Sequence, residues 1–428
     1  MAQDNRGRPP FRKGPPNRRP AAPRSGTPRS GAPHHHSGRP AITITGANVK
    51  TPRLRPQWIF DNMVGSISGN PVDGEAVTIL DPSGKFLGSA IYNSASKIRA
   101  RFFSLGNESF DHNYVIESVR AAAARRETHF PPQDSFRVVF SDADFLPGLI
   151  VDKLGPVLVL QVLTLAADRH RDAIIETLRE IYSPLGIVLR LDAAVRAKEG
   201  LSVGKVEVIG DVSKPLRLHL DGYTVFVDPL EGQKTGLFLD QRFNRRLMSP
   251  YCKNARVLDL FCHVGGWAFA AARAGARSVV GVDSSAQALA LATMGAPENG
   301  VPAEAFVKED VFDFLTDEKR ASEQYDVIIC DPPAFAKSHS MVNDAVRGYL
   351  SLNYRAMKRL APGGLLVSCS CSQQLSQAEF ETMLETAGRN ARIYFHIVAR
   401  GGQPPDHPPL LGFPESQYLK CVLLRRVG

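Results

Sequence analysis

The chain contains 428 residues and carries a formal net charge of +9, and this length predicts two to three domains. No apolar run reaches the roughly 18 residues that a membrane-spanning helix needs. Six cysteines without a regular spacing argue against a disulfide framework and against a zinc site. They favour reduced thiols in a cytoplasmic protein with no bound metal.

The positive charge is concentrated at the N-terminus. Residues 1–40 contain nine Lys or Arg and one Asp, whereas the remaining residues contain 43 basic and 42 acidic side chains. Residues 1–45 are rich in Pro, Gly, Arg and Ser, so they cannot bury enough apolar surface to offset the entropy of ordering. We expect a disordered basic tail that grips RNA phosphates without sequence preference. A merely solubilising extension is the alternative.

The segment 59–103 contains short apolar runs separated by turn sequences, a pattern typical of a small barrel of closely spaced strands. Lys97, Arg99 and Arg101 alternate along one of these runs, so they share one face of the predicted strand. Three cations on one face could follow a phosphate backbone. A solvated strand face without a ligand is the alternative.

The next segment reads as a small α/β domain. It contains apolar runs that predict strands and one amphipathic run that predicts a helix. The predicted strands are 136–140, 148–152, 157–162 and 187–190, and the predicted helix is 168–181. No catalytic constellation is visible in this segment.

Three successive strands of the C-terminal part carry acids near their ends, which indicates a nucleotide-type cofactor site. The strand 256–261 contains Asp259 and leads into a turn with Gly265, where glycine lets the backbone approach a ligand. Asp283 ends the next strand, 24 residues after Asp259 and near the roughly 20-residue spacing typical of a ribose-binding acid. Asp310 follows the third strand and is placed to contact an adenine edge.

The turn itself favours S-adenosylmethionine over a dinucleotide. A dinucleotide site would need G-x-G-x-x-G to receive a pyrophosphate, and here the turn contains only Gly265 and Gly266. S-adenosylmethionine has no phosphate, and Asp259 is placed near its amino group. A cofactor-free α/β domain, whose glycines only shape a turn, is the alternative.

Two further strand ends carry an acid and a cysteine. Asp331 follows the run 325–330, and Cys371 follows a second run that ends at Val367. Ligands of open α/β sheets bind at the carboxyl ends of the strands. A thiolate that attacks a ring carbon and an acid that steadies a ring nitrogen suit chemistry on a pyrimidine. Cys369 points the same way on a regular strand and competes for the role; small buried cysteines and a structural turn residue are the alternatives.

With these residues placed, the chain resembles the rRNA large subunit methyltransferase I family, whose members are S-adenosylmethionine-dependent RNA cytosine-5 methyltransferases. The resemblance runs from about residue 53 to the C-terminus. Strings in a shared order carry it: RLRPQW at 53–58, DFLPGL at 144–149, GQKTGLFLDQR at 232–242, DPPAF at 331–335, SCS at 370–372, DHP at 406–408 and FPESQYL at 413–419.

The resemblance implies three folded parts after the tail. They are a small PUA-like RNA-binding β-barrel at 46–118, a small α/β domain at 119–220, and a Rossmann-like class I methyltransferase domain with a seven-stranded, mostly parallel sheet at 221–428. It implies 23S rRNA or a large-subunit precursor as the partner and favours RNA contact by Lys97, Arg99 and Arg101. The cofactor-binding residues that it implies are Asp259, Gly265, Asp283, Asp310 and Asp331, and the nucleophile is Cys371.

The resulting hypothesis is methyl transfer to C5 of a cytosine in 23S rRNA. Cys371 adds to C6, and Asp331 hydrogen-bonds or protonates N3; the base that removes the C5 proton is not identified. The target must be single-stranded or flipped out, and Phe335 is placed either to stack on it or to fill the core beneath it.

Three other functions stay open. A guanine N2 methyltransferase needs no thiol, a uridine C5 methyltransferase uses a cysteine in the same place, and an rRNA-binding assembly factor could keep the pocket without turnover. The sequence indicates no oligomeric state, with a homodimer as one option.

Overall fold

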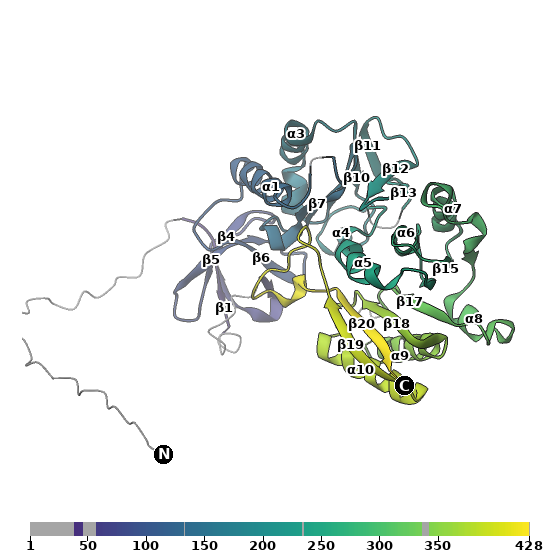
Figure 1. Ribbon diagram of the computed structural model, residues 1–428. Helices are drawn as coiled ribbons and strands as arrows, with labels where there is room; N and C mark the ends of the chain where they lie inside the picture. The colour runs from purple at the N-terminus through teal and green to yellow at the C-terminus, as the bar shows by residue number, and fades with distance from the viewer. Residues whose placement is uncertain (1–37, 46–56, 132, 233–234, 336–341, 428) are drawn as a thin grey trace, which may run out of the picture. The chain divides into compact units, whose positions relative to one another are not determined.

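The computed structural model describes residues 38–45, 57–131, 133–232, 235–335 and 342–427 (Figure 1). Most of the expected basic tail, residues 1–37, lies outside the described residues, and so does 46–56. Residues from Gly38 to Gly428 belong to one unit. Within the described ranges, no helix has both the length and the apolar character needed to span a bilayer.

Six strands near the N-terminus form one sheet in the order β2-β6-β5-β4-β1-β3. Its edge strands β2 and β3 are consecutive in the chain and are joined by one 3-10 turn, so the sheet curls round its own hydrophobic cluster as in a small barrel. The strands are β1 (Ala41–Ile44), β2 (Trp58–Phe60), β3 (Val64–Ser68), β4 (Ala76–Leu80), β5 (Phe86–Tyr92) and β6 (Ile98–Ser104).

Two of the expected domain boundaries are corrected at the N-terminal side. β1 lies before residue 46, yet it pairs with β3 and β4, so the barrel begins within the stretch assigned to the tail. The boundary at residue 118 falls inside α1 (His112–Glu127), a continuous helix. Val119 of α1 shares a hydrophobic cluster with Phe136 of the next sheet, so α1 belongs mainly to the central domain.

The central domain contains a five-stranded sheet in the order β11-β10-β9-β8-β7, in which only β9 and β10 are parallel. The four expected strands are confirmed, whereas the expected helix 168–181 is divided into α2 and α3 at His170. The elements are β7 (Phe136–Phe140), β8 (Leu149–Leu154), β9 (Val157–Val162), α2 (Leu165–Arg169), α3 (Arg171–Tyr182), β10 (Gly186–Arg190), α4 (Val195–Lys198) and β11 (Val206–Gly210).

The C-terminal domain contains a seven-stranded sheet in the order β16-β15-β14-β17-β18-β20-β19, and the expected mostly parallel sheet is confirmed. Five neighbouring strands are parallel, and β20 runs antiparallel to β18 and β19. The strands are β14 (Arg256–Leu260), β15 (Ser278–Asp283), β16 (Phe306–Lys308), β17 (Tyr325–Cys330), β18 (Leu360–Ser370), β19 (Tyr394–Gly401) and β20 (Lys420–Val427).

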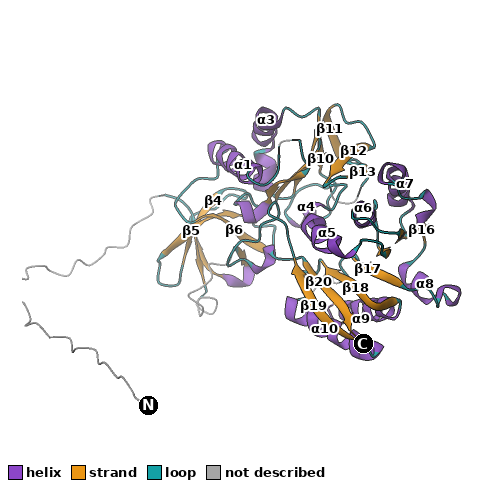
Figure 2. Ribbon diagram, in the orientation of Figure 1, coloured by secondary structure: helices purple, strands orange, loops and turns teal. Residues whose placement is uncertain are grey.

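Helices pack on this sheet, and Figure 2 shows α9 and α10 beside β18, β20 and β19. Their apolar faces are buried against the strands, as expected of a doubly wound sheet. The helices are α5 (Arg242–Met248), α6 (Gly266–Arg273), α7 (Ala286–Gly295), α8 (Val311–Thr316), α9 (Val342–Lys358) and α10 (Gln377–Ala391).

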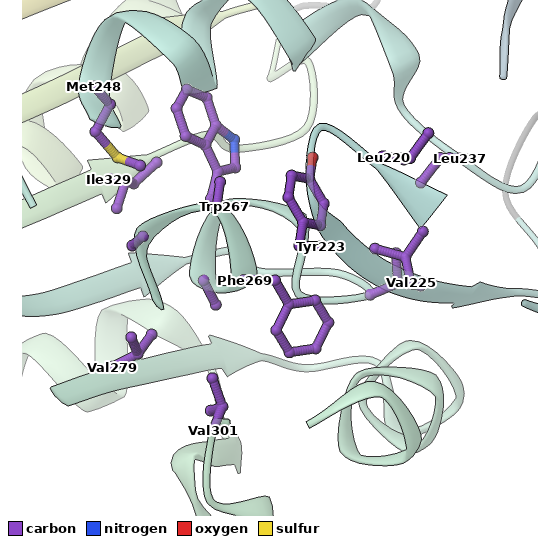
Figure 3. Close-up of a cluster of buried hydrophobic side chains, with 14 of the residues drawn as sticks. Leu220, Tyr223, Val225, Leu237, Met248, Trp267, Phe269, Val279, Val301 and Ile329 are labelled. Carbon is purple, nitrogen blue, oxygen red and sulfur yellow. The ribbon is translucent and has the colours of Figure 1, made fainter. Parts of the chain in front are cut away.

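A hairpin that precedes β14 in the sequence packs into the core of the C-terminal domain. It consists of β12 (Leu216–Leu220) and β13 (Tyr223–Val227), so the expected boundary after residue 220 falls in its turn. Tyr223 shares one hydrophobic cluster with Trp267 and Phe269 of α6 (Figure 3). Because the hairpin is buried against α6, it belongs to the C-terminal domain.

Arg101, one of the three cations expected to face RNA, is largely buried at the junction between the barrel and the central domain. Its Nη2 donates to Glu199 Oε1 at 2.9 Å, and its Nη1 lies 3.7 Å from Asp142 Oδ1. The guanidinium carbon lies 5.1 Å from the centre of the Trp58 ring. Two carboxylates withdrawn from water need a cation beside them, so Arg101 serves the junction instead of a phosphate.

Replacing Arg101 by Met is expected to lower the free energy of unfolding by about 3 kcal/mol, because it leaves the Glu199 carboxylate buried without a cation. Urea denaturation followed by circular dichroism measures this change. Lys97→Met is the control, because Lys97 is exposed and its loss should change stability by less than about 0.5 kcal/mol. Equal stability of the two variants would contradict the junction role of Arg101.

Candidate active site

The carboxyl edge of the seven-stranded sheet brings Asp331 and Cys371 together. Cys330, the last residue of β17, pairs with Ser368 of the parallel strand β18. Asp331 follows Cys330 directly, and Cys371 follows the last residue of β18. Both residues line a cavity of about 230 Å³, which we name the first cavity.

A tight turn after β14 forms one wall of the first cavity. Phe261, His263 and Gly265 have positive φ angles of 64°, 50° and 83°. A Cβ at Gly265 would lie 2.9 Å from the ring of Phe269, so glycine fits both the backbone angle and the space. Gly265 shapes the turn, and its neighbour Gly266 is the glycine that lines the cavity.

Asp259 lies behind the cavity rather than in its lining. It is fully buried, and its Oδ2 accepts a hydrogen bond from the backbone N–H of Ala268 at 3.0 Å. Its Oδ1 is a buried oxygen without a hydrogen-bond partner among the described residues. Burial raises the pKa of Asp259 well above its ordinary value, and the negative charge of Asp331 raises it further. Asp259 therefore braces the start of α6, and its raised pKa favours the protonated, uncharged form of the carboxyl group.

The structure separates the roles of the other two strand-end acids. Asp283 lines the cavity, and its carboxylate accepts hydrogen bonds from the backbone N–H groups of His263 at 2.9 Å and Ser285 at 2.8 Å. Asp310 is exposed and lines no part of the first cavity. It is the N-cap of α8, where its Oδ1 accepts from the Phe312 N–H at 2.8 Å.

Asp331 is held by two N–H donors. Gln241 Nε2 donates to its Oδ1 at 2.8 Å, and Trp267 Nε1 donates to its Oδ2 at 2.9 Å. Burial raises the pKa of Asp331 to about 6; the two N–H donors and the guanidinium of Arg245 oppose this rise, and the charge of Asp240 adds to it. Asp331 can therefore exchange a proton near neutral pH.

Sequence reasoning missed these two donors as site residues. Gln241 stands in the string 232–242, whose shared order was a usable signal, but the string alone does not say which side chain faces Asp331. Trp267 gives no signal, because it begins an Ala-rich helix and reads as a core residue. It does belong to the hydrophobic cluster, and only its Nε1 reaches the site.

Cys371 and Cys369 differ in their access to the cavity. β18 continues to Ser370, so Cys369 lies within the strand and is fully buried. Burial raises the pKa of Cys369 well above its ordinary value, which keeps it a thiol. Cys371 lies past the strand end, is half-buried and lines the first cavity.

Cys371 also lines a second cavity of about 460 Å³. The two cavities share four lining residues: Leu237, Phe238, Asp240 and Cys371. The second cavity has aromatic walls, to which the barrel contributes Trp58, the central domain Phe140 and the C-terminal domain Phe413 and Tyr418. Flat aromatic side chains around an open cavity suit an unstacked base.

Phe335 packs into the core and lines neither cavity. Its ring lies 4.7 Å from the ring of Tyr349, centre to centre, in a cluster with the buried face of α9. This packing favours the core-filling interpretation of Phe335, which is half-buried.

The first cavity fits S-adenosylmethionine by its charge. Three carboxyl groups line it, those of Asp240, Asp283 and Asp331, together with one guanidinium group, that of Arg245. A ligand with a sulfonium and an ammonium group would balance these carboxylates, whereas a pyrophosphate would be repelled. The unpartnered Oδ1 of Asp259 is a further acceptor beside the turn.

Comparisons with known proteins agree with this fit. A family model described as S-adenosylmethionine-dependent methyltransferase matches residues 188–425, and one described as PUA-like domain matches residues 42–105. Ribosomal RNA large subunit methyltransferase I of Aeromonas hydrophila is 36% identical over 392 residues, which cover 90% of this chain and 99% of the relative. The protein of the same name from Photobacterium profundum is 35% identical and covers 89% and 98%.

Two solved structures share the fold. A protein from Streptococcus mutans, provisionally described as an S-adenosylmethionine-dependent methyltransferase, superposes with a TM-score of 0.75 at 21% identity, covering 90% of this chain and 99% of its own. A structure of a provisionally described methyltransferase complexed with S-adenosylhomocysteine superposes with a TM-score of 0.77 at 21% identity, with the same coverage of 90% and 99%. The cofactor of this chain is S-adenosylmethionine, as the first family model shows.

The affinity for S-adenosylmethionine is expected to rise between pH 5 and pH 7, by up to about tenfold for each pH unit below the pKa of Asp331. Below that pKa of about 6 the carboxyl group is protonated and loses its attraction for the cationic ligand. Isothermal titration calorimetry measures the dependence. S-adenosylhomocysteine, which lacks the sulfonium charge, should show a smaller rise.

Asp331→Asn should weaken binding of the cofactor and flatten its pH dependence. Asp310→Asn is the matched control, because it neutralises an exposed acid outside the cavity lining and should keep the wild-type slope. A slope that survives in Asp331→Asn would assign the pH dependence to another group.

Proposed function

Because this chain belongs to the ribosomal RNA large subunit methyltransferase I family, we propose that it transfers a methyl group to C5 of a cytosine in 23S rRNA through a covalent cysteine adduct. One observation carries the proposal: Cys371 lines both the cavity that fits the cofactor and the neighbouring cavity with aromatic walls. A nucleophile at this junction can reach a base in one cavity while the methyl donor occupies the other.

C5 of cytosine is a poor nucleophile, and attack of a thiolate at C6 makes it reactive. The Cys371 sulfur forms a bond to C6, and the electron pair of the C5–C6 double bond moves toward C5. S-adenosylmethionine would supply the electrophilic methyl group to C5, and its sulfur would keep the electron pair of the broken S–CH3 bond and leave as S-adenosylhomocysteine. A base then removes the C5 proton, the double bond re-forms, and the thiolate leaves. The residue that acts as this base is not assigned.

Asp331 is the acid of the proposed mechanism. The negative charge that the thiolate brings into the ring delocalises onto N3, and a protonated carboxyl group can hydrogen-bond or protonate that atom. With a pKa of about 6, the group is mostly ionised at pH 7, where it attracts the cofactor, and it is still basic enough to take up the proton that it passes to N3. Gln241 and Trp267 fix the plane of the carboxyl group, so its orientation is set before the base arrives.

RNA binding is proposed for the exposed surface of the barrel. Lys97 is exposed, and Arg99, whose Nη1 donates to the carbonyl of Asn93 at 3.1 Å, stays at the surface beside it. Trp58 of the barrel also lines the second cavity. Its Nε1 donates to Asp142 Oδ1 at 2.8 Å, and its ring meets that of Phe413 edge-on at 5.2 Å. The barrel thus both holds RNA and forms one wall around the target base.

Trp58→Ala is expected to lower kcat/KM for rRNA about tenfold, because the base loses one aromatic wall, and to leave the affinity for S-adenosylmethionine unchanged. Methyl transfer at limiting RNA and calorimetry with the cofactor measure the two effects. Phe60→Ala is the control: Phe60 lies on the same strand and is partly exposed but lines neither cavity. Equal losses in both variants would indicate a general effect on the barrel.

The reaction itself is tested with tritium-labelled S-adenosylmethionine and unmodified 23S rRNA, followed by digestion to nucleosides. Label is expected in 5-methylcytidine and is expected to disappear in Cys371→Ala. Cys369→Ala is the matched control and should keep the activity, because Cys369 is buried within β18.

Other outcomes of this experiment separate the rival functions. Label in a methylated guanosine, or activity that survives Cys371→Ala, would identify an amine methyltransferase. Label in 5-methyluridine would move the target to uridine. Binding of rRNA without any transfer of label would indicate an assembly factor.

A further inference from the structure

Lys420 is a buried cation next to the proposed nucleophile. It begins β20, pairs with Ser370 of β18, and exposes only 5% of its surface. Lysine is rarely buried without a partner, because removing an ammonium group from water costs several kcal/mol. Its position therefore requires an explanation in terms of what surrounds it.

The ammonium group reaches the short segment that carries Cys371. Lys420 Nζ donates to the backbone carbonyl of Ser372 and to that of Tyr418, the latter at 2.8 Å. Ser372 is held from two other sides: its N–H donates to Ser370 Oγ at 3.3 Å, and its Oγ lies 3.4 Å from the hydroxyl of Tyr349. Cys371 is thus fixed between two anchored serines, with the ammonium group beside the second one.

Within the described residues, the hydrogen bonds of the ammonium group go to the backbone carbonyls of Ser372 and Tyr418 and not to a carboxylate. Burial lowers the pKa of Lys420 to about 8, and the negative charges of the Cys371 thiolate and of Glu379 oppose this decrease. The lysine therefore stays largely protonated near pH 7, and the largest favourable charge it meets is that of the thiolate.

Three described groups near Cys371 do not offer it a free positive charge. Tyr349 on α9 and Tyr418 beside β20 have pKa values raised by burial, so they are neutral phenols. Arg137 lines the second cavity, but its guanidinium is bonded to Asp152 at 2.7 Å. Asp240 lines both cavities with Cys371, and its negative charge opposes formation of a thiolate. Lys337, three residues after Ala334 in the segment that follows Asp331, lies outside the described residues.

We propose that Lys420 is the charge partner of Cys371: its ammonium group stabilises the thiolate and holds the segment that presents it to the target base. The proposal rests on the proposed role of Cys371 as nucleophile. Lys420 lines neither cavity and does not touch the substrate, so it is a positioning residue. When the thiol ionises, its proton passes to bulk water and Lys420 stays protonated throughout. When the adduct collapses, the departing thiolate meets the same cation.

The rate at which iodoacetamide alkylates Cys371, measured against pH by peptide mass spectrometry, tests the proposal without RNA or cofactor. In the wild-type protein the midpoint should lie below the ordinary value for cysteine of about 8.5. Lys420→Met should raise the midpoint by about one unit and slow alkylation at pH 7 about tenfold. Lys420→Arg, which keeps the charge, should retain the low midpoint.

Lys153→Met provides the matched control. Lys153 is also buried, at 7% exposure, and also donates to two backbone carbonyls, those of Asp134 and Gly155, but it lies on β8 in the central domain. A purely structural lysine should behave like this one, so Lys153→Met should leave the midpoint of Cys371 unchanged.

Two results would overturn the charge pair. One is a wild-type midpoint in folded Lys420→Met, and the other is a midpoint at or above about 8.5 in the wild-type protein itself, which needs no variant to fold. The failure of the proposed function is separate from both. A midpoint that depends on Lys420 together with label in a methylated guanosine would support the charge pair and refute cytosine-5 transfer.

Discussion

Parallel pairing of β17 with β18 is the constraint on which the site depends. The register Cys330↔Ser368 ends the two strands at one edge, so residues 331 and 371, far apart in the chain, border one cavity. β14 and β15 pair in the same sense and bring the turn at Gly265 and the acid Asp283 to that edge. Parallel strands with short turns therefore assemble the cofactor half and the nucleophile half of the site with a single sheet.

The parts that the sequence predicts well are those that follow from chain periodicity. Buried parallel strands read as continuous apolar runs, so their ends, and the acids at those ends, can be placed without a structure. This is why Asp283 and Asp331 reach the cavity. The same reasoning assigns Asp259 to the correct strand, β14, but does not predict that its side chain lies behind the cavity. The pattern of residue types does not indicate the direction in which a side chain near a sharp turn points.

The rest depends on contacts between distant segments, which no local pattern encodes. The alternation of basic residues predicts that Arg101 lies on the same strand face as Lys97 and Arg99. The sequence does not indicate that Arg101 pairs with Glu199, a buried residue about 100 positions later in the central domain. Helix α1 crosses an expected boundary because its apolar stripe packs on a later sheet. Asp310 caps helix α8, and the ring of Phe335 packs against the ring of Tyr349. For Arg101 and α1 the deciding partner lies in a later segment of the chain, whereas Asp310 caps its own helix.

The mixed origin of the second cavity limits how this protein can change. Its wall includes Trp58 from the barrel, Phe140 from the central domain and Tyr418 from the C-terminal domain. Trp58 is held in turn by Asp142 and stacked against Arg101. If the barrel were exchanged for that of another RNA-binding protein, the second cavity would lose the wall formed by Trp58. The proposed RNA-binding surface of the barrel would be lost at the same time. The three domains are consecutive in the sequence, but they share one binding cavity. A change of target base therefore requires matched substitutions in more than one domain.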